Sequence, residues 1–513
     1  MMKVFAAIDV GSYEVAMKIF EISEKNGMKQ IDHLRRKIEL GTDTYHTGKV
    51  NPVRMDELCD VLSEFNKVMK AYKVDAYKAY ATSAIRETEN TMIVTEQIKL
   101  RTGISVDVLS NSEQRFMHFK AVVSKGESFA EIMKKSTAVV DIGGGSIQIS
   151  LFDKDMLVTT QNIRLGILRV KDMLSSMQAR TIDYVHLLGE LIDNQLDSFK
   201  TLYLGDRKIH NIIIIDDYIS QAMRKVNDNK DIITSKEFHE LIETYRSHSV
   251  ESIARYLSMD EESARLLPQS IVLLSKITNM MKAKTLWAPG VSLADGIAYE
   301  YAENNKLLSV KRDFDRDIMA AAEEMCVRYS GNLERNRLVE KVAVSIFDDT
   351  KKLHAMGKRE RLLLRVAAML SDCGKYISLE AAAECGYEII MATEMLGLSN
   401  TEREIIANVV RFNKMKFKYY KETQSPTMLS MDTYLVMVKL TAIFRVADGI
   451  CRSFRVKLDG IKTTIKDEEL VITIDSEEDF DLEKGFFSRK SDFFEEVFSI
   501  KPVIRIKKRL NAL

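Results

Sequence analysis

The chain has 513 residues, with 75 lysine or arginine and 75 aspartate or glutamate residues, so its formal net charge is 0. At ~150 residues per domain, this length predicts three or four domains. A nucleic-acid or anionic-membrane partner normally requires a basic excess, so the charge balance argues against DNA and membrane partners. Charged residues make up 29% of the chain and apolar residues 46%, which excludes disorder as the main state.

The cysteines and the N-terminus indicate where the protein works. The five cysteines are scattered and form no Cys-x-x-Cys pair, which disfavours a disulfide framework or a zinc ribbon. No apolar run approaches the ~20 residues that a membrane helix requires. The start, MMKVFAAIDVGS, alternates like a strand and does not read as a signal peptide. We therefore expect a cytoplasmic protein.

Two segments follow the same pattern of strand, turn and strand. In residues 4–22 the turn is Asp9-Val10-Gly11-Ser12, and in residues 138–152 it is Asp141-Ile142-Gly143-Gly144-Gly145-Ser146. Each segment predicts a β-hairpin whose turn carries an aspartate, glycine and a serine. Two such hairpins, one opening each half, predict a duplicated α/β architecture with a cleft between the halves.

The remaining elements follow from hydrophobic periodicity. We expect a helix over residues 55–72, strands over 76–82 and 209–215, a polar helical stretch over 235–257 and a helix over 295–304. Helical periodicity then dominates from about residue 311 to 451. Short alternating strands appear after residue 456, notably over 470–474, followed by a helix around 493–498.

The two turns have the chemistry of a phosphate site. Glycines let backbone N–H groups approach phosphate oxygens, a serine adds a hydroxyl donor, and an aspartate can hold Mg²⁺ directly or through water. A single Asp-x-Gly turn is usually no more than a turn. Two in equivalent places favour phosphate binding.

Seven segments of the chain resemble one known family. AAIDVGS (6–12), YATSAIRETEN (80–90), LSNSEQ (109–114) and VVDIGGGSIQIS (139–150) resemble the Ppx/GppA family of exopolyphosphatases and guanosine pentaphosphate phosphohydrolases, which has the actin-like ATPase superfold. The segments at 357–378, 396–414 and 440–453 are similar to the HD-type helical domain of its longer members.

The resemblance implies four domains. These are two actin-like (RNase H-like) α/β lobes at 1–130 and 131–308 with a cleft between them, an all-α HD-like domain at 311–455, and a small α+β domain at 456–513. The family's dimers imply a homodimer.

The resemblance also implies a reaction. Water would attack a terminal phosphoryl group of polyphosphate or of a guanosine penta- or tetraphosphate, assisted by Mg²⁺ near Asp9 and Asp141. Arg86 would pair with phosphate or brace the loop, and its alternative is an ion pair with Glu87 or another acidic neighbour. The residues implied to hold phosphate are Gly11, Ser12, Gly143, Gly144, Gly145 and Ser146.

The sequence departs from the family where the chemistry is expected. In the family pattern Gly-x-Glu-Glu-Ala-Arg the second glutamate is the catalytic base, and here Gln114 stands in that place. In Gly-Gly-Gly-Ser-Thr-Glu the last residue is a second carboxylate, and here it is Gln148. An amide cannot take a proton from water or supply negative charge to a metal. Glu113 could act as the base if the loop shifts by one residue.

Three further loops differ from the family pattern. Tyr13-Glu14 adds bulk and negative charge beside the first turn, and Asp216-Asp217 would repel a polyanion unless Mg²⁺ intervenes. Ala294 stands where the family has an arginine.

The HD-type segment also lacks its metal ligands. The family's His-Asp-Ile-Gly reads Ser371-Asp372-Cys373-Gly374, and its later histidine cluster reads Ala383-Glu384-Cys385-Gly386. No histidine follows His354, which we expect at the surface or between helices. We therefore predict that this metal site is lost.

Two functions stay open from the sequence. One is a Ppx/GppA-type phosphohydrolase, and the other is a catalytically impaired regulatory protein that binds polyphosphate or a nucleotide. A filament-forming actin-like protein is disfavoured, because the helical extension resembles the enzyme family. The sequence does not distinguish polyphosphate from a guanosine nucleotide, since both present terminal phosphates.

Overall fold

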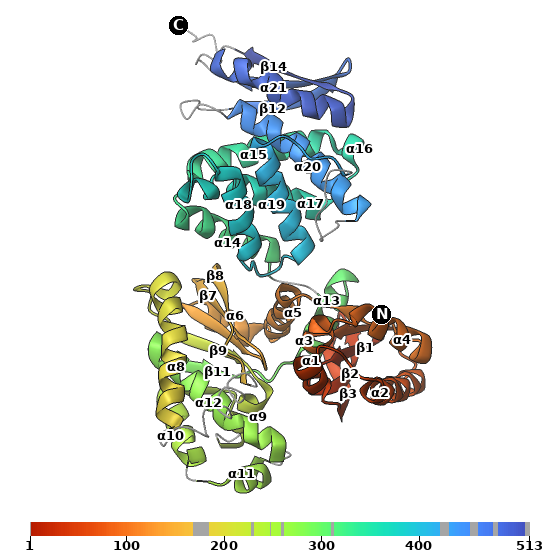
Figure 1. Ribbon diagram of the computed structural model, residues 1–513, viewed down its shortest axis with the longest axis vertical. Helices are drawn as coiled ribbons and strands as arrows, with labels where there is room; N and C mark the ends of the chain where they lie inside the picture. The colour runs from red at the N-terminus through yellow and green to blue at the C-terminus, as the bar shows by residue number, and fades with distance from the viewer. Residues whose placement is uncertain are drawn as a thin grey trace. The chain divides into compact units, whose positions relative to one another are not determined.

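The computed structural model describes residues 2–167, 184–226, 230–246, 248–257, 261–308, 312–420, 430–451, 460–475 and 481–507. The chain divides into two compact units, Met1–Asp313 and Phe314–Leu513. The N-terminal unit contains two β-sheets with helices, and the C-terminal unit is mainly helical with one small sheet (Figure 1).

The first sheet of the N-terminal unit has five strands in the order β3-β2-β1-β4-β5. Their bounds are β1 Lys3–Val10, β2 Glu14–Ser23, β3 Gly27–Lys37, β4 Ala76–Ala81 and β5 Asp107–Val108. Strands β1 to β3 are antiparallel, and β4 runs parallel to β1. Alternate side chains of β1 face opposite sides, as the period of a strand requires. Ile8 packs in a core with α2 (Pro52–Ala71), whereas Phe5 and Ala7 pack with α13 (Leu293–Asn304).

The second sheet contains the same arrangement of three antiparallel strands and one parallel strand. It has six strands in the order β10-β11-β9-β6-β7-β8. Strands β6 to β8 are antiparallel, and β9 runs parallel to β6 as β4 does to β1. The predicted duplication of the hairpin is thereby confirmed. The bounds are β6 Thr137–Ile142, β7 Ile147–Asp153, β8 Met156–Ile163, β9 Asn211–Ile215, β10 Ile232–Thr234 and β11 Thr285–Trp287.

Helices connect the strands of the N-terminal unit. Those of the first half are α1 Leu40–Thr47, α3 Ser83–Glu87, α4 Thr91–Thr102, α5 Asn111–Val123 and α6 Glu127–Met133. Those of the second half are α8 Tyr184–Phe199, with a π-helical turn Lys200–Leu204, then α9 Asp217–Val226, α10 Ser235–Arg246, α11 Val250–Leu257 and α12 Glu261–Met281. The polar stretch expected over residues 235–257 is therefore two helices, α10 and α11. None of the helices in the described ranges is long and apolar enough to cross a membrane.

Helix α13 ties the end of the N-terminal unit to the first sheet. The domain division from the sequence assigns it to the second lobe, yet it buries its apolar side chains against β1 and β2. A Cβ on Gly296 would lie 1.9 Å from the carbonyl oxygen of Met117, so a side chain here would block the approach of α13 to α5. Lys120 of α5 adds ion pairs to Glu300 at 3.1 Å and to Glu303 at 2.9 Å.

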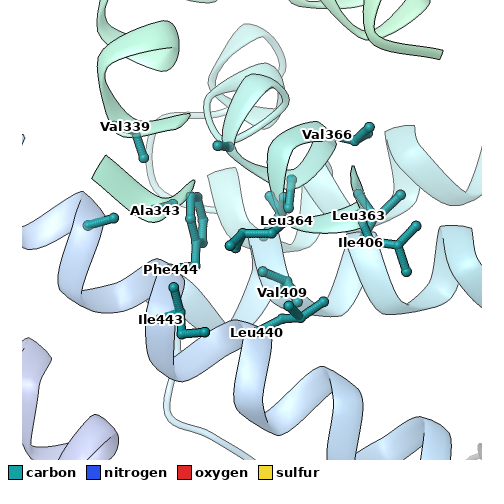
Figure 2. Close-up of a cluster of buried hydrophobic side chains, with 14 of the residues drawn as sticks. Val339, Ala343, Leu363, Leu364, Val366, Ile406, Val409, Leu440, Ile443 and Phe444 are labelled. Atoms are coloured by element: carbon teal, nitrogen blue, oxygen red, sulfur yellow. The ribbon is translucent and has the colours of Figure 1, made fainter. Parts of the chain in front are cut away.

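The C-terminal unit is built on one hydrophobic core. Figure 2 shows part of it, where side chains of α15, α17, α19 and α20 meet. Its helices are α14 Phe314–Arg328, α15 Leu333–Asp349, α16 Lys351–His354, α17 Lys358–Met369, a 3₁₀ turn Cys373–Tyr376, α18 Ala382–Ala392, α19 Asn400–Lys414, α20 Met431–Ile450 and α21 Asp481–Phe498. The helical character predicted from about residue 311 is therefore confirmed.

A three-stranded sheet closes this unit. Its strands are β12 Gly460–Lys466, β13 Glu469–Asp475 and β14 Lys501–Lys507, in the order β12-β13-β14. Leu470 and Ile472 of β13 belong to the same core as the helices, as does Phe494 of α21. The small α+β piece expected after residue 456 thus shares the core of the helical region.

Candidate functional site

The two predicted turns have the same backbone hydrogen bond. Gly11 N donates to Glu14 O at 3.0 Å, and Gly143 N donates to Ser146 O at 3.0 Å. Each turn follows a strand that carries its aspartate one residue before the strand ends. The two Asp-x-Gly motifs are therefore structurally equivalent hairpin turns.

The first turn is held by its neighbours. Ser12 Oγ lies 2.7 Å from Ser83 Oγ and 3.1 Å from the hydroxyl of Tyr45. Arg35 donates to the carboxylate of Glu14, with Nη2 2.6 Å from Oε1. The negative charge expected beside this turn is therefore paired with an arginine.

The second turn contains a buried charged cluster. Arg115 Nη1 lies 2.6 Å from Asp141 Oδ1, and His118 Nδ1 lies 2.6 Å from Asp141 Oδ2. The side chains of Arg115 and Asp141 are 7% and 6% exposed. Arg115 Nη2 also donates to Ser146 Oγ at 3.1 Å. One arginine thus joins the aspartate of the strand to the serine of the turn.

Electrostatics in this cluster favours the ionised aspartate. Burial opposes ionisation of Asp141, but Arg115 and His118 hold its pKa well below the usual range. Burial also opposes protonation of His118, yet the Asp141 carboxylate raises its pKa overall. The Asp9 carboxylate adds to this rise, so the aspartates of both turns act on the same histidine.

The N-terminus of α5 positions the residues expected to act as the base. Ser110 caps the helix, and Glu113 Oε2 accepts hydrogen bonds from Ser110 N at 2.9 Å and from Ser110 Oγ at 2.6 Å. Glu113 therefore closes a capping box. Gln114 accepts instead from Arg86 Nη1 at 3.2 Å.

Arg86 braces this loop in the structure. It donates to the carbonyl of Leu109 at 2.8 Å and to Asn111 Oδ1 at 2.7 Å, besides its bond to Gln114. These contacts match the bracing role that was one of the alternatives for Arg86. Glu87 is not one of these three partners.

Gln148 lies directly across the hairpin from Asp141. It is 4% exposed, and β6 and β7 pair Asp141 with Gln148. The glycine-rich turn beside it is packed against the residues that follow β8. A Cβ on Gly166 would lie 2.3 Å from both Gly144 O and Ser146 N. The backbone of residue 166 therefore rests on the turn.

The other two unusual loops are structural in their contacts. Asp216 Oδ1 accepts from Ile219 N at 2.8 Å and Oδ2 accepts from Ser270 Oγ at 3.0 Å, so this carboxylate caps α9. Asp295 pairs with Lys18 at 2.8 Å. Ala294 beside it is 2% exposed, in the core between α13 and the first sheet.

Sequence reasoning missed the roles of Arg115 and His118. Both lie on α5, three residues apart, and this spacing puts them on one face of the helix. This spacing, just after the Ser110-x-x-Glu113 capping signature, was the one sign in the sequence that the two side chains could act together. Their joint target, Asp141, lies on a strand that the sequence alone does not place beside them.

The helical unit contains a second cluster of this kind. Asp372, in the segment similar to the family's His-Asp-Ile-Gly, is contacted by Arg335 at 3.4 Å and by Lys375 at 2.8 Å. Arg335 also lies 2.6 Å from Asp448. No group of three or more metal-ligating side chains is found within the described parts of the chain.

His354 is a core residue of the helical unit. It is 1% exposed, so of the two expected positions, at the surface or between helices, the surface is excluded. Its Nε2 lies 2.7 Å from the carbonyl oxygen of Phe347, and its Nδ1 accepts from Met356 N at 2.9 Å. Both ring nitrogens are thereby satisfied by backbone groups.

Comparison with solved structures shows the fold. The Aquifex aeolicus Ppx/GppA family member aligns with a TM-score of 0.51 at 21% identity, covering 60% of this chain and 99% of that one. An exopolyphosphatase from Cytophaga hutchinsonii aligns with a TM-score of 0.50 at 17% identity, covering 60% and 100%. The expected actin-like lobes are confirmed by this likeness.

Curated relatives match parts of the chain or most of it. Exopolyphosphatase 1 of Mycobacterium tuberculosis is 27% identical over 144 residues, which are 28% of this chain and 40% of that protein. A bifunctional 3-dehydroquinate synthase/phosphatase of Fusobacterium nucleatum is 24% identical over 33% of this chain and 26% of its own length. The chain thus spans less than half of these two relatives.

One longer match and two family models cover most of the sequence. A guanosine-5'-triphosphate,3'-diphosphate pyrophosphatase of Aeromonas hydrophila is 18% identical over 456 residues, 87% of each chain. Residues 319–487 match domain III of the Ppx/GppA phosphatases, and residues 18–305 match the Ppx/GppA phosphatase family itself. The chain belongs to the Ppx/GppA phosphatase family.

Proposed function

We propose that this chain is a Ppx/GppA-type phosphohydrolase that releases the terminal phosphate of inorganic polyphosphate or of a guanosine pentaphosphate. Family membership and relatives named as an exopolyphosphatase and a guanosine pentaphosphate pyrophosphatase support the substrate class. The observation that carries the proposal is that Arg115 contacts both Asp141 and the Ser146 hydroxyl of the glycine-rich second turn, while His118 contacts the other oxygen of Asp141. Phosphoryl transfer needs such converging charges and donors more than covalent chemistry.

The chain's own residues would bind and orient the phosphate. Gly143 to Ser146 would present backbone N–H groups, and the Ser146 hydroxyl and the Arg115 guanidinium stand at the same turn. A guanidinium matches the geometry of phosphate oxygens and stays charged at all relevant pH values. Gly11 and Ser12 would contribute the equivalent turn of the other lobe.

The Mg²⁺ implied by the resemblance does not fit these residues as they lie. Both oxygens of Asp141 already accept from charged or ionisable side chains, at 2.6 Å each. The two places for further carboxylates hold Gln114 and Gln148, which bring no negative charge. We therefore derive no step through a metal ion.

A second candidate function rests on the amides at two places where the family has carboxylates, Gln114 and Gln148. Gln114 contacts Arg86, and the neighbouring carboxylate of Glu113 is engaged in the capping box. A protein that binds terminal phosphates with little turnover would have this arrangement. It would act as a polyphosphate- or nucleotide-binding regulator.

Phosphate release distinguishes the two functions. Long-chain polyphosphate and guanosine pentaphosphate would each be incubated with the full chain, with and without Mg²⁺, and binding would be measured in parallel. Turnover of either substrate supports the hydrolase, and binding without turnover supports the regulator. If neither substrate binds and no phosphate is released, both functions are refuted.

Homodimer formation and cytoplasmic location stay predictions. Light scattering tests the first, and cell fractionation tests the second.

A further inference from the structure

We infer that Arg115 takes the place of a divalent cation, so that this site binds the terminal phosphate without a resident metal ion. The inference rests on the proposed function and specifies the chemistry of the same site. The residues present at Asp141 do not fit the metal ion that the resemblance implies.

The charge of Asp141 is already neutralised by side chains. Its side chain is 6% exposed, and an ionised carboxylate so deeply buried requires a positive partner. The Arg115 guanidinium is that partner, with Nη1 2.6 Å from Oδ1, and His118 takes the other oxygen. A metal ion at either oxygen would stand close to the guanidinium, where like charges repel.

The Arg115 guanidinium also reaches the glycine-rich turn. Arg115 Nη2 donates to Ser146 Oγ at 3.1 Å and lies 3.4 Å from the position that a Cβ on Gly143 would occupy. The same side chain thus neutralises Asp141 and borders the turn expected to hold phosphate. The family pattern Gly-x-Glu-Glu-Ala-Arg has alanine at the position of Arg115. The arginine is therefore a further departure of this chain from the family pattern.

The helical unit provides an independent case of the same arrangement. Arg335, 10% exposed, contacts both Asp372 and Asp448, and Lys375, Lys414 and Lys490 surround them at 2.8, 3.5 and 3.4 Å. The predicted loss of a metal site there coincides with buried aspartates neutralised by side-chain cations. This chain therefore pairs arginine with Asp141 and with Asp372, two buried aspartates that the resemblance connects with metal ions.

Two measurements on the wild-type chain test the inference. Mn²⁺ binding followed by electron paramagnetic resonance should show no stoichiometric site. Titration calorimetry should show that linear triphosphate binds. Its affinity in buffer with EDTA and its affinity in buffer with Mg²⁺ should agree within about threefold. One tightly bound Mn²⁺ per chain, or binding more than tenfold weaker in EDTA, would overturn the inference while leaving the proposed function intact. No binding under either condition would instead refute the proposed function, and the inference with it.

Variants extend the test. Arg115→Ala should weaken triphosphate binding in EDTA by about 10- to 100-fold, the range for a charge-assisted hydrogen bond, and Mg²⁺ should restore part of it. Arg115→Lys keeps the charge and should retain metal-independent binding if the alanine variant fails to fold. Arg101→Ala is the matched control, because Arg101 pairs with Asp56 on the surface and lies outside the site. Equal triphosphate affinities for Arg115→Ala and wild type in EDTA would contradict the inference.

Discussion

Arg335 Nη2 lies 2.6 Å from Asp448 Oδ1, and the same guanidinium reaches Asp372, so one buried arginine connects two buried aspartates of the helical unit. Removing one partner of such a cluster leaves an uncompensated buried charge. Lys375, Lys414 and Lys490 complete the cluster, so side-chain cations neutralise both carboxylates. It makes the helical unit dependent on Arg335 for stability.

Arg335→Ala should therefore lower the free energy of unfolding of the helical unit by about 3–5 kcal/mol. Arg337→Ala, two residues along the same helix, is the control, since Arg337 is half-exposed and pairs with Glu323 at the surface. It should cost at most about 1 kcal/mol. Urea unfolding followed by circular dichroism measures both. Equal effects of the two substitutions would show that the buried cluster is not stabilising.

Asp448 should make this unit sensitive to acid. Burial opposes its ionisation, but Lys490 and Arg335 lower its pKa to about 2. A lowered pKa stabilises the folded state above the unfolded pKa of ~3.9, and this stabilisation is lost as the pH falls toward 2. The contribution is on the order of 2 kcal/mol.

Asp448→Asn should abolish that acid dependence. The difference in unfolding free energy between wild type and variant should shrink between about pH 4 and pH 2. Circular dichroism follows the helices, and the fluorescence of Trp287, the sole tryptophan of the chain, follows the N-terminal unit. The fluorescence transition should be the same in both proteins. A difference in stability that stays constant with pH would contradict the assignment.

Restoring carboxylates at Gln114 and Gln148 tests whether these amides limit hydrolysis. Gln114→Glu with Gln148→Glu should raise phosphate release from polyphosphate by about 10²–10⁴-fold, the usual value of general acid–base help. Arg86, 3.2 Å from Gln114, is placed to pair with the new carboxylate. Gln161→Glu, on β8 of the same sheet, is the control for added negative charge.

Two outcomes would change this interpretation. A small gain from the double variant would show that a further feature limits hydrolysis, with the ion pair of Arg115 and Asp141 the first to examine. Strong wild-type hydrolysis that survives Gln114→Ala but collapses on Glu113→Gln would identify Glu113 as the base. The capping box argues against that, because Glu113 Oε2 already accepts two hydrogen bonds from Ser110.

Hairpins and helices could be predicted from the sequence because their signals are local. The alternation in residues 4–22 and the apolar spacing in residues 55–72 lie within single elements. The capping box was equally local, in the Ser110-x-x-Glu113 spacing, but the resemblance drew attention to Glu113 as a base. The pairing of Arg115 with Asp141 could not be predicted, since it joins a helix to a strand 26 residues away. Similarly, α13 follows the second sheet in the chain but packs on the first.

Gly166→Ala should lower the stability of the protein, whereas Gly145→Ala should leave it unchanged. Together the two variants test whether the turn binds phosphate. A Cβ on Gly166 would lie 2.3 Å from Gly144 O and Ser146 N, so Gly166→Ala must displace the turn. Overpacking of this kind typically costs about 1–3 kcal/mol, and thermal unfolding should show it as a lowered Tm.

A Cβ on Gly145 meets no atom within 4 Å, so Gly145→Ala should leave the Tm unchanged. If the backbone of the turn receives a phosphoryl group, that same methyl should nevertheless weaken triphosphate binding, because it occupies the space that glycine leaves for phosphate oxygens. Titration calorimetry on Gly145→Ala therefore decides the matter: unchanged stability with weaker binding locates the phosphate at this turn, whereas unchanged binding moves it elsewhere.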